Sequence, residues 1–211
     1  MKKYKKRIAD RILNRKLRAK GAVLVEGAKW CGKTTTAEQI AGSVLYMQDP
    51  ASEKQNLEMA EINPGRLLKG TAPRLIDEWQ MAPKLWDAVR FEVDQRDEFG
   101  QFILTGSSVP GDLSEISHTG TGRISRMLMR PMSLYESLDS SGEVSLSDLF
   151  SGKNDVDGEN HIDLNKLAFC ICRGGWPKAL DQEEEISLMQ ANESINDLET
   201  MGLFFENMCI R

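Results

Sequence analysis

The chain has 211 residues, of which 28% are charged and 40% hydrophobic, and its formal net charge is −5. It is long enough to bury a sizeable core, as one large domain or one domain with an appendage, and its net acidity gives no general reason to expect nucleic-acid binding. No apolar run approaches the roughly 18 residues that span a membrane, and no apolar segment follows the basic start as a secretory signal would require. We therefore expect a cytoplasmic protein whose unpaired cysteines, Cys31, Cys170, Cys172 and Cys209, are free thiols.

Basic residues are concentrated at the start of the chain. Residues 1–20 contain ten Lys or Arg and one acid, Asp10. Residues 4–18 carry apolar side chains at helical spacing, which predicts a basic amphipathic helix. Its charges are most simply a solvated face; a surface for nucleic acid or an acidic partner, or a flank of a nucleotide base, are alternatives.

The chemically most informative stretch comes next. An apolar run over 22–25, predicted as a strand, precedes the pattern G-x-x-x-x-G-K-T, and a helix is predicted over Lys33–Ala41. A loop with glycines at its edges can turn its backbone N–H groups around a phosphate, and the following helix adds partial positive charge. Lys33 can reach the β- and γ-phosphates, and the hydroxyl of Thr34 can bind Mg²⁺. The predicted nucleotide contacts are Gly27, Ala28, Lys29, Trp30, Cys31, Gly32, Lys33, Thr34 and Thr35.

A second strand is predicted over Ser43–Met47, followed by helices over 52–61 and 66–69. The next strand, over 74–78, ends in two carboxylates, Asp77 and Glu78. Ligands of open α/β sheets collect at the carboxyl ends of strands. Asp77 is suited to holding Mg²⁺ through its water shell, and Glu78 to acting as the general base for an attacking water.

A helix is predicted over Leu85–Arg96 and a strand over Gln101–Leu104. Thr105 and Ser107 follow this strand, and either could contact the γ-phosphate or the attacking water; the sequence does not distinguish them. The loop Pro110–Gly122 is rich in Gly, Ser and Thr, and we expect it to be mobile.

Three arginines, Arg123, Arg126 and Arg130, follow that loop. A guanidinium placed against a γ-phosphate accelerates its transfer by about 10³–10⁵. Arg123, at the loop exit, is our candidate for this role, and structural ion pairs are the alternative for all three.

The rest of the chain is less informative. Ser133–Glu136 has capping-box spacing, which predicts a short helix. Residues 139–160 are polar and are predicted to form a linker or a long surface loop. A further helix is predicted over Leu164–Cys172. Beyond Asp181 the chain is acidic, with apolar residues at helical spacing. His118 and His161 lack ligand partners at metal spacing and are expected on the surface. We divide the chain into an ATP-binding domain (1–138), a helical extension (139–180) and a C-terminal remnant (181–211).

Several motifs together resemble one family, the prokaryotic AAA+-like P-loop ATPases that carry a C-terminal nuclease-like domain of unknown function. They are Trp30-Cys31 in the loop, Ile76-Asp77-Glu78-Trp79-Gln80, Phe102 to Ser108, Gly122-Arg123, Arg130 to Glu136, and Arg173-Gly174-Gly175-Trp176-Pro177. The resemblance implies an α/β three-layer sandwich with a parallel sheet, in which one strand separates the Walker A and Walker B strands. It also implies ATP and Mg²⁺ as ligands, with Lys33, Thr34, Asp77, Glu78 and the segment Thr105–Ser107 around them.

The end of the chain departs from that family. Residues 181–196 are short and acidic where the family has a winged-helix-like region, and 198–206 already resemble the opening of its last domain. We therefore expect an internally deleted and truncated member.

The leading functional hypothesis is ATP binding with Mg²⁺-dependent hydrolysis. Alternatives are a nucleotide-gated switch with little turnover and a decayed fragment. A small-molecule kinase is disfavoured, because the loop Pro110–Gly122 contains no basic residue except His118. The expected partners are ATP and an unidentified protein or a second copy of the chain; net charge does not support nucleic acid.

Overall fold

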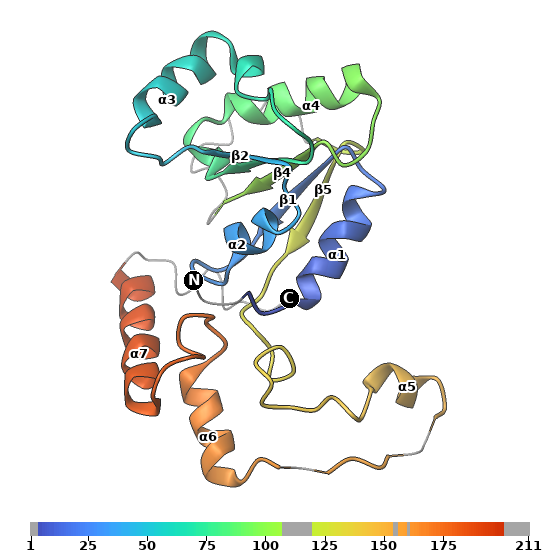
Figure 1. Cartoon of the computed structure of the whole chain (residues 1–211), viewed down its shortest axis with the longest axis vertical. Helices are drawn as coiled ribbons and strands as arrows, with labels where there is room; N and C mark the ends of the chain where they lie inside the picture. The colour runs from blue at the N-terminus through green and yellow to red at the C-terminus, as the bar shows by residue number, and fades with distance from the viewer. Residues whose placement is uncertain (1–3, 107–119, 154–155, 160, 201–211) are drawn as a thin grey trace. The chain divides into compact units, whose positions relative to one another are not determined.

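The computed structural model describes residues 4–106, 120–153, 156–159 and 161–200 (Figure 1). The chain forms two compact units. The first, here called the sheet unit, is Arg7–Arg130, and the second, the C-terminal unit, comprises Met1–Lys6 and Pro131–Arg211. Ser107, His118 and most of the loop over 110–122 lie outside the described residues. No helix in the described part of the chain is long and apolar enough to span a membrane.

A parallel five-stranded sheet forms the centre of the sheet unit. Its strands are β1 (Ala22–Glu26), β2 (Ser43–Tyr46), β3 (Arg74–Asp77), β4 (Phe102–Thr105) and β5 (Ile124–Leu128). Their spatial order is β2-β3-β4-β1-β5, and every pairing is parallel. β4 therefore lies between β1, which precedes the predicted phosphate loop, and β3, which ends in Asp77, as the sequence predicted.

Helices cover both faces of this sheet (Figure 1). α1 (Ile8–Leu17) and α2 (Lys33–Glu38) lie on one face, and α3 (Glu53–Ile62) and α4 (Lys84–Arg96) on the other, with short 3₁₀ turns η1 (Pro64–Arg66) and η2 (Trp79–Met81). Because successive strand residues point to opposite faces, Val23 and Val25 pack with Leu13 and Leu17 of α1, whereas Leu24 packs with α4. The predicted three-layer α/β sandwich is confirmed.

The structure differs from the sequence analysis in several local elements; the helix predicted over 66–69 is a 3₁₀ turn, η1, over Pro64–Arg66. β5 was not predicted, because Ser125 and Arg126 interrupt its apolar pattern; it is an edge strand that buries only Ile124 and Met127. At Ser133 the expected capping contact forms, with its N–H 2.8 Å from Oε2 of Glu136, but residues 134–138 form turns and no helix. A capping box satisfies backbone donors in a turn as well as in a helix, so spacing alone could not distinguish the two.

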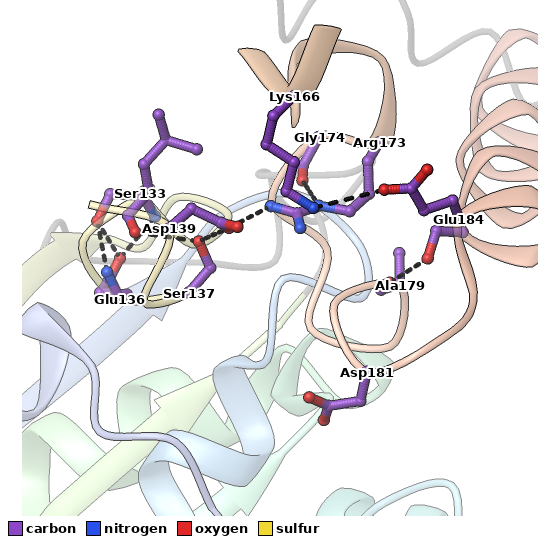
Figure 2. Close-up of polar contacts among 12 residues, drawn as sticks. Ser133, Glu136, Ser137, Asp139, Lys166, Arg173, Gly174, Ala179, Asp181 and Glu184 are labelled. Carbon is purple, nitrogen blue, oxygen red and sulfur yellow. Dashed lines mark hydrogen bonds and ion pairs between the residues drawn. The ribbon is translucent and has the colours of Figure 1, made fainter. Parts of the chain in front are cut away.

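The C-terminal unit contains α5 (Leu146–Phe150), α6 (Leu164–Arg173) and α7 (Glu184–Thr200). A partly buried ion pair joins its segments: Nη2 of Arg173, at the end of α6, lies 2.8 Å from Oδ2 of Asp139 (Figure 2). The Ser137 hydroxyl donates to the same oxygen at 2.6 Å. Our division of this part at residue 180 stays a prediction.

A buried arginine fixes the edges of the sheet unit. The guanidinium of Arg7, immediately before α1, donates from Nη1 to the carbonyl of Cys31 at 2.9 Å and from Nη2 to the carbonyl of Arg130 at 2.8 Å. The backbone N–H of Arg7 donates to Oδ2 of Asp10 at 2.8 Å. One planar cation thus connects the start of α1, the predicted phosphate loop and the segment after β5.

Replacing Arg7 should destabilise the protein. Arg7→Met leaves two carbonyl acceptors without their donor, so we expect the free energy of unfolding in urea to fall by about 2–4 kcal/mol. Arg11→Met, on the exposed face of the same helix, is the control and should change it by about 0.5 kcal/mol or less. Equal effects of the two substitutions would contradict the bridging role of Arg7.

The Asp139–Arg173 pair should give a pH-dependent stability. Burial raises the pKa of Asp139, but the hydrogen bonds from Arg173 and Ser137 outweigh it, so this pKa lies below its ordinary value. The contribution of the carboxylate is therefore complete above the unfolded pKa of about 3.9 and is lost as pH falls through the lower folded value. Asp139→Asn should cost about 1–2 kcal/mol near neutral pH, and its unfolding curve should converge with wild type in acid.

The control for this pair is Asp148→Asn. Asp148 is exposed and pairs with Lys153 at 3.3 Å, so its replacement should cost well under about 1 kcal/mol at any pH. A constant difference between wild type and Asp139→Asn down to strongly acidic pH would contradict the assignment.

Candidate functional site

Three strand ends bring the predicted site residues together. In the sheet register Thr105 of β4 pairs with Val25 of β1 on one side and with Asp77 of β3 on the other. The Thr105 hydroxyl donates to Oδ1 of Asp77 at 2.6 Å, and the Thr34 hydroxyl donates to the same oxygen at 2.7 Å. Residues from three distant parts of the sequence therefore meet at one carboxylate.

The loop between β1 and α2 depends on its two glycines. Gly27 has φ +147°, and a Cβ there would lie 2.0 Å from the backbone carbonyl oxygen of Met129. Gly32, directly before α2, has φ +98°. Both values lie where side chains other than glycine are strained. The loop therefore takes its close turn because glycine is present where it enters and where it leaves.

Lys33 lies inside this loop. Its ammonium donates to the carbonyls of Gly27 and Ala28, both at 2.9 Å, and the residue is 6% exposed. Burial lowers the pKa of Lys33, and the carboxylates of Glu78 and Asp77 oppose that shift. An ammonium has three N–H donors, so one remains to donate to a phosphate oxygen. A phosphate would also supply the negative charge that this buried cation lacks.

The remaining loop residues differ in exposure. Trp30 has φ +62° and is 39% exposed, with Nζ of Lys29 4.8 Å from the centre of its ring. Cys31 is fully buried, its Sγ 3.6 Å from the carbonyl oxygen of Met129, and burial raises the pKa of its thiol. Thr35 is exposed in the first turn of α2.

Glu78 follows β3 in an unusual backbone conformation. Its φ of +55° and ψ of +45° are left-handed, and it precedes the 3₁₀ turn η2. Trp79 in that turn is 3% exposed and packs on Trp86 of α4, with ring centres 5.0 Å apart. This stacking anchors the turn, and Nε2 of Gln80 donates to Oε2 of Glu78. A non-glycine residue held in this region is frequently associated with a functional site.

The structure does not bring Arg123 to this site. It precedes Ile124, which pairs with Ala22 at the start of β1, so it lies at the amino edge of the sheet. Arg123 is therefore level with the residue before Ala22. From there to Gly27 the chain advances six residues at about 3.3 Å each, or roughly 20 Å. Arg123 is exposed and pairs with Asp94 of α4 at 2.8 Å, which raises the pKa of the guanidinium.

Of the other two arginines, Arg126 lies in β5 and Arg130 lies two residues beyond its end. Arg126 pairs with Glu26 at 3.0 Å. Arg130 follows Met129, whose N–H donates to the carbonyl of Glu26 at 2.7 Å, so it lies at the same edge as the loop. Without a predicted strand over 124–128, the sequence could not order these three residues along the sheet.

Sequence reasoning also missed three polar residues near this edge. Tyr46 pairs with Asp77 in the sheet register and donates to Oε1 of Glu38 at 2.6 Å, which raises the pKa of its phenol to about 12. Arg7 and Gln80 contact the loop and Glu78, as described above. Gln80 stands in the segment Ile76 to Gln80, but a single sequence gives its side chain no role, and no pattern in the sequence marks Tyr46 or Arg7.

The oxygens at this edge fit a magnesium ion. Mg²⁺ prefers oxygen ligands and keeps several waters, with one or two protein groups and phosphates completing its shell. The hydroxyl of Thr34 and the carboxylate of Asp77 are such groups, 2.7 Å apart. In the described part of the chain no three His, Cys, Asp or Glu residues form a metal cluster, so phosphate and water oxygens would have to supply the other ligands.

Comparisons with known proteins identify similar folds and a family. A search of curated proteins found no match. Among solved structures, the Walker-type ATPase PABY2304 of Pyrococcus abyssi is similar in fold, with a TM-score of 0.56 and 15% identity over 95% of this chain and 75% of that one. A signal transduction ATPase with numerous domains and a tetratricopeptide repeat sensor, PH0952 from Pyrococcus horikoshii, gives a TM-score of 0.48 and 14% identity over 92% of this chain and 33% of that one. The family model described as AAA domain matches residues 19–138. This match covers more than half of the chain and contains the loop, Asp77, Glu78 and Thr105, and the protein therefore belongs to the AAA domain family of P-loop ATPases.

Proposed function

We propose that this protein binds ATP together with Mg²⁺ and hydrolyses it. The observation that carries the proposal is the convergence on Asp77, where the hydroxyls of Thr34 and Thr105 donate to one carboxylate oxygen. Lys33 begins α2 and its ammonium contacts the loop carbonyls, and Glu78 follows Asp77 directly. This set contains a phosphate-binding cation, oxygen ligands for a metal and a carboxylate that can accept a proton.

Each residue has a distinct part in the proposed reaction. Lys33 donates to the β- and γ-phosphate oxygens, and the backbone from Gly27 to Thr35 surrounds the phosphates. Thr34 and Asp77 hold Mg²⁺, which when bound neutralises charge on the phosphates. Because the loop is tightly packed around Lys33, little reorganisation is required when charge develops on the γ-phosphate.

Glu78 acts as general base in this proposal. Its carboxylate orients a water for in-line attack on the γ-phosphorus and accepts the proton that the water loses. Thr105 extends from β4 toward Asp77 and contacts the γ-phosphate side of the site; Ser107, two residues later, is its alternative. A nucleotide-gated switch would share the binding residues and would hold ATP without cleaving it.

Two substitutions separate binding from hydrolysis. Lys33→Ala should abolish ATP binding, because the buried phosphate contact is lost, and Lys54→Ala, exposed on α3, should bind as wild type does. Glu78→Gln should bind ATP normally and lose turnover by about 10²–10⁴, with exposed Glu58→Gln as its control. Binding is measured by titration calorimetry and turnover by phosphate release.

The outcomes of these experiments are distinct. Equal ATP affinity in wild type and Lys33→Ala would contradict nucleotide binding in this loop. Bound but uncleaved ATP in a single-turnover experiment with wild type would identify a switch.

Arg123 could act only on a nucleotide bound by another copy of the chain, unless the structure rearranges. We propose that it does so in trans, since it is exposed and lies far from its own loop. Arg123→Ala and Glu78→Gln should each be inactive alone, and mixing them should restore part of the turnover, because an intact Arg123 then meets an intact Glu78. Arg126→Ala is the control and should stay active alone. Full activity of Arg123→Ala in dilute, monomeric protein would refute this role.

A further inference from the structure

Gln80 is a polar residue at the site to which the proposed mechanism assigns no role. It lies in η2, and its amide N–H donates to Oε2 of Glu78. An ionised carboxylate can only accept hydrogen bonds, so the NH₂ end of the amide has to face Glu78. The carbonyl end, Oε1, is thereby directed away from Glu78.

That carbonyl is packed against the strand next to β3. A Cβ added to Gly106 would lie 2.4 Å from Oε1 of Gln80 and 3.3 Å from Nε1 of Trp79. Gly106 directly follows Thr105, which donates to Asp77. The Gln80 amide therefore contacts Glu78 through its NH₂ group, and its carbonyl approaches the backbone at Gly106. Because Gly106 has no side chain, there is room for this carbonyl.

The carbonyl is buried, and Oε1 has no hydrogen-bond donor among the described residues. A buried acceptor without a donor is unfavourable, and turning the amide over would place two acceptors, Oε1 and the Glu78 carboxylate, against each other. The contact with Glu78 thus determines which way the amide lies, even though it leaves the carbonyl unsatisfied.

The backbone alone does not fix the Glu78 carboxylate. The left-handed conformation of Glu78 and the packing of Trp79 on Trp86 hold its Cα, but three side-chain torsions separate the Cα from the carboxylate oxygens. A general base displaced by about 1 Å can lose about 10² in rate. The hydrogen bond from Gln80 is made at the carboxylate itself and so restrains these torsions.

We propose that Gln80 is a positioning residue, which fixes the Glu78 carboxylate for water activation and holds it in register with Gly106, the residue after Thr105. This inference rests on the proposed hydrolysis, in which Glu78 is the base. Gln80 acts through Glu78 and not on the nucleotide. Removing its amide should therefore affect the chemical step and leave ATP binding unchanged.

The first test is Gln80→Leu, measured by steady-state phosphate release and by ATP titration. We expect kcat to fall by about 10- to 100-fold, with KM and the ATP dissociation constant unchanged. Gln55→Leu, exposed on α3, is the matched control and should keep the wild-type kcat. A rise in KM or in the dissociation constant that accounts for the whole loss of activity would overturn the inference.

A double-mutant cycle separates positioning from a structural role. In the Glu78→Gln background Gln80→Leu should cause no further loss of the residual turnover, because there is no base left to position. A loss of the same factor in both backgrounds would show that Gln80 does not act through Glu78, and would overturn the proposal.

Gly106→Ala is a second variant that tests the contact between Gln80 and Glu78, and it can be used if Gln80→Leu does not fold. Gly106 does not have the positive φ that excludes other residues, so alanine is allowed there, but its methyl group would displace the Gln80 amide. We expect the same fall in kcat, again absent in the Glu78→Gln background. Wild-type kcat in Gly106→Ala would count against the inference.

The experiments also separate this inference from the proposed function. Turnover that is lost in Glu78→Gln and retained in Gln80→Leu would overturn the role of Gln80 and leave the hydrolysis mechanism standing. Turnover that is unaffected by Glu78→Gln would overturn the mechanism, and the positioning role with it.

Discussion

The two hydrogen bonds accepted by Oδ1 of Asp77 are the contacts on which the site depends. Thr34 comes from the helix after β1 and Thr105 from the end of β4, at 2.7 and 2.6 Å. They can meet at Asp77 only because β4 lies between β1 and β3, so that three parallel strands end side by side. A sheet order with β1 directly beside β3 would remove Thr105 from this position. The order of the strands is thus part of the chemistry of the site.

The phosphate loop combines close packing with an incompletely neutralised charge. Gly27 lies against the Met129 carbonyl and Lys33 donates to two loop carbonyls, so the loop conformation is set before a ligand arrives. Burial lowers the pKa of Lys33, because the carboxylates of Glu78 and Asp77 do not fully compensate for its loss of water. A bound phosphate would remove that penalty. The same burial that disfavours the isolated cation therefore favours an anionic ligand.

The sequence was most informative where one residue type is required by its backbone or its chemistry. The glycines of the loop, Lys33 and the carboxylates after β3 were recognisable because phosphate binding needs those groups at that spacing. The position of a residue along the strands of the sheet could not be recognised from the sequence in the same way. The three arginines, Arg123, Arg126 and Arg130, are chemically alike, and their locations depend on β5. This strand was not predicted, because polar residues interrupt its apolar pattern. Arg7 contacts residues that are far away in the sequence, and Gln80 contacts Glu78 within a turn. Neither kind of contact produces a periodic pattern in the sequence.

Arg7 relates the loop to the limits of the sheet unit. The chain enters this unit at Arg7 and leaves it at Arg130, and one guanidinium donates to the carbonyl of Arg130 and to that of Cys31 in the loop. Because the guanidinium is planar and rigid, a rotation of the Cys31 carbonyl cannot keep its hydrogen bond unless Arg7 or the Arg130 carbonyl also moves. Arg7 therefore restrains the loop together with the two ends of the sheet unit.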